Sequence, residues 1–99
     1  MARQFEVFRV AGGVLVVVLQ SDLLDAMQTR VVAPLLPLGT AGRPISGLNP
    51  EIRIGGETLV LTPQLAATLT LTELGRPLGS IAHLRDSVTR AVDLLLSGV

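Results

Sequence analysis

The sequence contains no cysteine and only one histidine, His83. Without cysteine, the chain has neither disulfides nor thiolate metal sites. A single imidazole cannot by itself build a histidine-based metal site. We therefore expect a protein that uses no metal and no other cofactor.

Lysine is also absent, so all eight cationic side chains are arginines. Eight acidic residues balance them, and the formal net charge is zero. A neutral chain is a poor candidate for nonspecific nucleic-acid binding, which depends on neutralising several phosphates. The charge balance therefore argues against a domain that binds nucleic acid on its own.

Aromatic residues are scarce, with only Phe5 and Phe8, whereas apolar residues make up 48% of the 99 positions. A chain of this length forms one domain, residues 1–99, and buries only a modest fraction of its surface. Part of the aliphatic surface is therefore expected to face a second copy of the chain, which predicts a homodimer.

Long apolar runs are missing. The longest is residues 14–19, well short of the roughly 18 residues that a membrane span requires. No apolar stretch follows the opening residues 1–4, so the sequence predicts no signal peptide. We expect a cytoplasmic protein that makes no contact with a membrane.

The clearest periodic pattern lies in residues 79–99. Apolar residues recur there at steps of three and four, which predicts an amphipathic helix with Ser80 as its N-cap. Leu94 falls on the polar side of this helix and Leu96 at the rim of the apolar stripe. Such placement suggests a surface reserved for a partner, although simple docking on a sheet would explain the stripe equally well. The stripe consists of Ile81, Leu84, Val88, Ala91, Val92, Leu95 and Val99.

The rest of the chain is typical of strands. The segments with strand character are residues 5–10, 14–19, 29–33, 51–54, 57–61 and 67–74. The run 14–19 has no polar face and is expected to be covered on both sides. Gly55 and Gly56 predict a tight hairpin. Pro34 and Pro37 are expected to end the third strand at an edge or bulge, before a long surface loop over 38–50. The fold class predicted is α+β: a small antiparallel barrel-like sheet with a C-terminal helix.

Catalytic groups are few. Asp22 and Asp25 could share one face of a helical turn begun by Asp22, but an Asp22 cap and a solvated Asp25 explain the spacing better. His83 lies on the polar side of the helix with no triad around it. The arginines, Arg30 among them, are expected to be solvated on the surface.

The order of several motifs resembles the CcdB family of plasmid-maintenance toxins. The resemblance covers nearly the whole chain, and its most specific pieces are the Gln-Ser-Asp that ends an apolar strand and the Ile-Gly-Gly-Glu hairpin. The matching stretches are Phe5-x-Val7-Phe8, residues 18–25, Arg30-x-Val32-x-Pro34-Leu35, residues 48–57, Thr62-x-x-Leu65-Ala66 and Gly98-Val99.

This resemblance implies a CcdB/MazF-like fold, with an SH3-like barrel sheet and a C-terminal helix, in a homodimer. It also implies a non-enzymatic toxin that binds the DNA gyrase A subunit and traps gyrase on cleaved DNA. A CcdA-like antitoxin with a flexible acidic C-terminal segment would neutralise it, and contact with DNA would be indirect. Carried over by motif, the gyrase-binding residues are Leu23, Leu24, Asp93, Leu96, Ser97, Gly98 and Val99.

One position departs from the family motif. Where the family's well-known toxin has a tryptophan that stacks on a gyrase arginine, this chain has Ser97. Such a stack contributes about 0.5–2 kcal/mol. Two alternatives therefore stay open: a MazF-like endoribonuclease on the same fold, and a non-toxic relative that keeps antitoxin binding.

Overall fold

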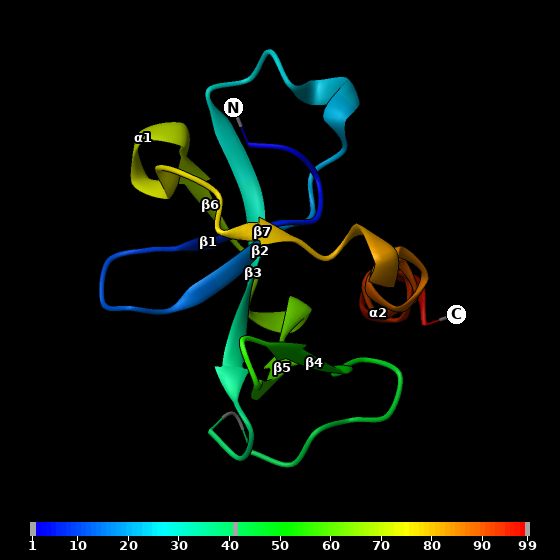
Figure 1. Cartoon of the computed structure of the whole chain (residues 1–99). Coiled ribbons are helices and arrows are strands. Elements are labelled where there is room, and N and C mark those ends of the chain that lie inside the picture. Colours follow the sequence, from blue (N-terminus) through cyan, green and yellow to red (C-terminus); the bar gives the residue numbers. More distant parts are fainter. Residues whose placement is uncertain (1, 41, 99) are drawn as a thin grey trace.

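A computed structural model describes residues 2–40 and 42–98 as a curled antiparallel sheet with a C-terminal helix (Figure 1). The sheet runs in the order β4-β5-β3-β2-β1-β7, and β6 also pairs with β3. The curled sheet and helix confirm the predicted α+β class. The strands are β1 (Glu6–Arg9), β2 (Leu15–Val18), β3 (Thr29–Pro37), β4 (Glu51–Ile54), β5 (Glu57–Leu61), β6 (Ala67–Thr70) and β7 (Gly79–Ser80).

In the part of the chain that the structure describes, two α-helices flank the sheet, and Figure 1 shows them on opposite sides of it. They are α1 (Leu71–Leu74) and α2 (Arg85–Ser97). The described ranges also contain three short 3-10 turns: η1 (Asp22–Leu24), η2 (Pro63–Leu65) and η3 (Ala82–Leu84). Within residues 2–40 and 42–98, no helix has the length and apolar character needed to cross a membrane.

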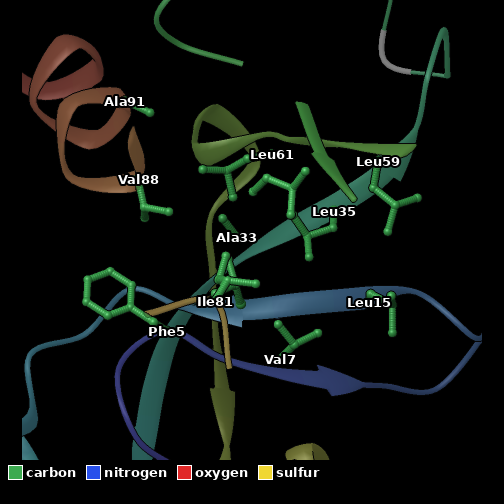
Figure 2. Packing of buried hydrophobic residues seen from close by; sticks show 12 residues of the cluster. Phe5, Val7, Leu15, Ala33, Leu35, Leu59, Leu61, Ile81, Val88 and Ala91 are labelled. Atoms are coloured by element: carbon green, nitrogen blue, oxygen red, sulfur yellow. The ribbon is translucent and has the colours of Figure 1, made fainter. Parts of the chain in front are cut away.

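Strand β2 separates two apolar clusters, because successive side chains of a strand point to opposite faces. Leu15 and Val17 join the larger cluster, which lies between the sheet and α2 and includes Val88 and Ala91 (Figure 2). Val16 and Val18 join a smaller cluster with Phe8 and Leu74. All four β2 residues are buried. The expected cover on both faces of the run 14–19 is therefore confirmed over 15–18, whereas Val14 is 38% exposed.

The Gly55-Gly56 hairpin is confirmed. Ile54 pairs with Glu57 across the turn, and both glycines have positive φ, 59° and 83°. Two consecutive residues with positive φ match the twist of the flanking strands, which is why glycine is favoured at both positions.

The expected end of the third strand is wrong, because β3 continues through Pro34 to Pro37. Pro34 pairs with Val16 on one side. On the other side, β3 changes neighbour, from β6 as far as Val32 to β5 from Leu35 onward. The proline therefore lies where no ladder N–H is needed. Its carbonyl oxygen accepts hydrogen bonds from the N–H and hydroxyl of Thr62, at 3.0 and 2.9 Å.

The strand expected over residues 67–74 is also shorter than predicted. It stops at Thr70, and α1 begins at Leu71. The side chains of Thr70 and Glu73 each accept from the other's main-chain N–H, which forms a capping box. The Thr-x-x-Glu spacing of Thr70 and Glu73 is the sequence pattern from which this helix start could have been predicted.

The C-terminal helix begins later than predicted. Ser80 belongs to β7, where it pairs with Glu6, and it does not cap α2. Its hydroxyl accepts from the N–H of Ala82 at 3.1 Å, and η3 leads into α2 at Arg85. Leu94, expected on the polar side, is half-buried. Its Cδ2 would lie 3.5 Å from a Cβ built on Gly47, so α2 packs against the loop around that residue.

Candidate functional site

Leu23 and Leu24, the first part of the predicted binding set, lie on η1 and face solvent. Their side chains are 93% and 50% exposed. The turn forms because the Ser21 hydroxyl accepts from the N–H of Leu23 at 3.1 Å. The cap is therefore Ser21 rather than Asp22, the residue that sequence analysis favoured. Two neighbouring leucines with this exposure form an apolar surface that nothing in the described chain covers.

Arg30 is buried and holds the segment that carries η1. The expectation of a solvated Arg30 is wrong, because its side chain is only 2% exposed. The guanidinium donates to four main-chain carbonyl oxygens, those of Ala2, Asp25, Met27 and Thr29, at 2.7–3.2 Å. These bonds tie the N-terminal segment and the end of the η1 loop to β3. A periodicity argument could not find this role, because the partners are main-chain atoms.

The second part of the predicted set lies at the end of α2. Leu96 is 77% exposed. The Ser97 hydroxyl donates to the carbonyl oxygen of Asp93 at 2.9 Å, so this short side chain is turned back along the helix. Gly98 ends the helix with a φ of 74°, and its N–H donates to the carbonyl of Leu94. Val99 lies outside the described residues.

The two parts of the set are separated in space, as the positions of η1 and the end of α2 in Figure 1 show. A turn over residues 3–6 links the regions that carry them. The main-chain N–H of Gln4 donates to Asp22 Oδ1 at 2.8 Å, and its Nε2 donates to the carbonyl of Leu19 at 2.9 Å. Sequence analysis missed this link, because Gln4 belongs to no motif.

Phe5 completes this turn in a strained conformation. Its φ is 71°, the one positive value at a residue other than glycine in the described chain. The ring is buried in the larger cluster near Val88 (Figure 2), and the Arg85 guanidinium carbon lies 5.8 Å from the ring centre. A bulky residue at positive φ is unusual, and about 1–2 kcal/mol of strain is offset here by burial of the ring.

Gln4 and Phe5 line two cavities that extend toward the two parts of the set. The larger, about 290 Å³, includes Asp22 next to Leu23. The smaller, about 100 Å³, includes Asp93 on α2. The turn is therefore the structural element shared by both regions.

Of the catalytic candidates, Asp22 and His83 line different cavities. The Asp22 carboxylate is engaged by the N–H of Gln4. His83 lines a separate cavity of about 180 Å³ with Arg53 and Ser80, among apolar side chains. Over the two described ranges, no three His, Asp or Glu side chains form a cluster able to hold a metal ion.

Comparison with known proteins gives one family and a shared fold. A comparison with curated protein sequences gave no significant match. The solved structures with a similar fold include two endoribonucleases. An endoribonuclease in complex with its cognate antitoxin, from a mycobacterial species, has a TM-score of 0.80 at 16% identity, covering 97% of this chain and 95% of that one. A mycobacterial endoribonuclease has a TM-score of 0.76 at 16% identity, with coverages of 95% and 89%. The profile of the CcdB protein family matches residues 4–98, so the chain belongs to the CcdB family of toxins from toxin–antitoxin systems.

Proposed function

We propose that this chain is the toxin of a type II toxin–antitoxin module, that it binds the DNA gyrase A subunit and traps the gyrase–DNA cleavage complex, and that a cognate antitoxin neutralises it. On this proposal the protein binds its target without catalysing a reaction of its own. Membership of the CcdB family supports the proposal. The observation that carries it is the exposure of Leu23 on η1 and of Leu96 near the end of α2.

The leucines supply the affinity in this proposal. Burying a fully exposed leucine side chain contributes about 1.5–3 kcal/mol, and Leu23 is 93% exposed. Gly98, with no Cβ, allows the main chain to approach gyrase closely. Ser97 adds little, because its hydroxyl is already bonded to the carbonyl of Asp93. We therefore assign the anchoring role of the family's tryptophan to the apolar surfaces of Leu23, Leu24 and Leu96.

The antitoxin is proposed to bind at the loop between β1 and β2 and at the 39–50 loop. A cleft of about 310 Å³ lies at the first of these, lined by Arg9, Gly12, Gly13 and Val14, with Glu57 on the β5 side. The Arg9 Nη1 donates to the carbonyl of Gly13 at 3.0 Å, which holds the guanidinium at the cleft. An acidic, flexible antitoxin segment would find a bidentate donor there. Its affinity should fall as salt rises.

A binding experiment tests the gyrase proposal. Purified protein is titrated by calorimetry into the gyrase A subunit, with Leu23→Glu and Leu96→Glu as test variants. Leu65→Glu is the matched control, because Leu65 is 49% exposed but lies on η2, outside the predicted set. We expect each test variant to weaken binding at least tenfold and the control to leave it unchanged. Equal binding by all three variants would show that Leu23 and Leu96 do not form the gyrase-binding surface.

An endoribonuclease is the second candidate. Arg53, Ser80 and His83 line one cavity, and this combination places an acid–base group near an arginine. The apolar lining of that cavity and the zero net charge weigh against an RNA substrate. Incubation with RNA decides between the candidates. Cleavage that is lost in His83→Ala would favour the nuclease, whereas the gyrase proposal expects intact RNA. A protein that binds antitoxin but neither cleaves RNA nor binds gyrase would be a non-toxic relative.

A further inference from the structure

Among the residues that the structure describes, the cleft beside the turn over residues 3–6 has two guanidinium groups without protein acceptors. Its volume is about 290 Å³, and its charged lining residues are Arg3, Arg85, Glu6 and Asp22. Within residues 2–40 and 42–98, neither Arg3 nor Arg85 donates from its side chain to a hydrogen-bond or ion-pair acceptor. Each guanidinium carries five N–H donors, so this cleft has unused capacity for acceptors. We call it the Arg3–Arg85 cleft.

The two carboxylates of the cleft are bonded to the main chain instead. Glu6 Oε1 accepts from the N–H of Arg3 at 2.7 Å. Asp22 Oδ1 accepts from the N–H of Gln4 at 2.8 Å. These bonds stabilise the turn, and all four charged side chains line one cleft.

Arg85 is also held in place. Its guanidinium carbon lies 5.8 Å from the centre of the Phe5 ring, a cation–π contact that requires no hydrogen-bond acceptor. Phe5 itself is fixed by burial and by the bond from its N–H to the carbonyl of Val18 at 2.8 Å. A guanidinium positioned in this way loses less side-chain freedom when it binds a carboxylate.

We propose that the Arg3–Arg85 cleft binds carboxylate side chains of an extended acidic peptide, namely the acidic segment of the antitoxin. This inference rests on the antitoxin part of the proposed function and adds a second contact to the one at Arg9. Unpaired planar donors at a preformed cleft match a carboxylate, which accepts two parallel N–H bonds. Because Asp22 lines the cleft and Leu23 follows it, a peptide bound here lies next to η1. Antitoxin and gyrase would then compete for adjoining surface.

The first test uses a synthetic peptide, acetyl-Glu-Leu-Glu-amide, and the intact chain. NMR resonances of the arginine Nε–H groups are followed during the titration, with acetyl-Gln-Leu-Gln-amide as the uncharged control. We expect saturable shifts at Arg3 and Arg85 with the acidic peptide only. Arg3→Gln and Arg85→Gln should each lower the affinity about tenfold. Arg76→Gln, an exposed arginine outside the cleft, should leave it unchanged. Equal shifts with the uncharged peptide, or no shift at Arg3 and Arg85, would overturn the inference.

The second test uses the proposed antitoxin, for which the candidate is the product of the gene next to the one that encodes this chain. If the antitoxin binds and both glutamine variants bind it as tightly as the native chain, the cleft is not its site, while the proposed function stands. If the antitoxin does not bind the native chain, the antitoxin part of the proposed function fails. The peptide titration then still decides whether the cleft accepts carboxylates. Thermal unfolding of each variant separates lost binding from lost folding.

Discussion

The Nε–H of Arg30 donates to the main-chain carbonyl of Ala2 at 2.9 Å, across 28 positions of sequence. This bond anchors the N-terminal segment beside β3. The same guanidinium reaches Asp25 and Met27, which follow η1. One buried cation therefore positions both the turn that carries the Arg3–Arg85 cleft and the segment that displays Leu23.

Replacing Arg30 should destabilise the protein strongly. Arg30→Lys keeps the charge but loses the planar fork, so several of its carbonyl acceptors are left without donors in a buried site. We expect the free energy of unfolding to fall by about 3 kcal/mol. Urea denaturation measures the change, with Arg76→Lys as the exposed control. A loss below about 0.5 kcal/mol, the range of ordinary surface substitutions, would contradict the assigned role.

The hairpin glycines can be tested through backbone strain alone. Gly56 has a φ of 83° and nothing within 4 Å of an added Cβ, so Gly56→Ala meets only the cost of positive φ. We expect a loss of about 1 kcal/mol in unfolding free energy. Gly79→Ala is the matched control, because Gly79 also has open space around it but no positive φ. The two variants should differ in chemical denaturation, and equal stability would refute the turn assignment.

The hydrogen bonds of the Glu73 carboxyl predict that the stability of the protein depends on pH. Hydrogen bonds from the N–H and the hydroxyl of Thr70, at 2.8 and 3.0 Å, lower the pKa of the Glu73 carboxyl from its usual 4.5. Its contribution to stability is therefore present above pH 4.5 and is lost as the pH falls through the lower folded pKa. Thr70→Ala should move the Glu73 midpoint up toward 4.5 in an NMR titration. A native midpoint already at 4.5 would rule the capping box out.

The assembly prediction concerns exposed apolar surface. Leu78 and Leu95, which lie outside the proposed gyrase-binding set, are 58% and 42% exposed in the single chain. A self-complementary patch that buries such residues forms a symmetric homodimer. Light scattering at micromolar concentration should report the mass of two 10.4 kDa chains. One chain's mass throughout the micromolar range would contradict the prediction.

Local patterns predicted the parts of the fold that local forces specify. The Gly55-Gly56 hairpin follows from turn geometry. The burial of both faces of β2 follows from its continuous apolar run. The late start of α2 could not be read from its stripe, because pairing of Ser80 with Glu6 draws that residue into the sheet. The continuation of β3 through Pro34 could not be predicted either. It depends on the change of the neighbouring strand from β6 to β5 at that point along β3.

In the candidate site too, local motifs predicted some residues, whereas residues that depend on long-range contacts were missed. Leu23 and Leu96 were assigned through family motifs, and both are exposed; their binding role stays a prediction. The link from Gln4 to Asp22 and the strained Phe5 were missed, because each depends on contacts between segments distant in sequence. Arg30 was misplaced because surface exposure is the usual state of arginine, whereas here main-chain carbonyls replace water around it.

The cleavage assay with purified DNA gyrase and plasmid DNA tests the central claim most directly. The native chain should produce linear DNA, detected after denaturation of the trapped complex. Deletion of Gly98 and Val99 should abolish this product without changing thermal stability, because a helix end contributes little to folding. Ser97→Trp should strengthen gyrase binding by up to a few kcal/mol and so increase the yield of linear DNA. If the native chain yields no linear DNA, or if the deletion and Ser97→Trp both leave the yield unchanged, the gyrase account is wrong for this protein.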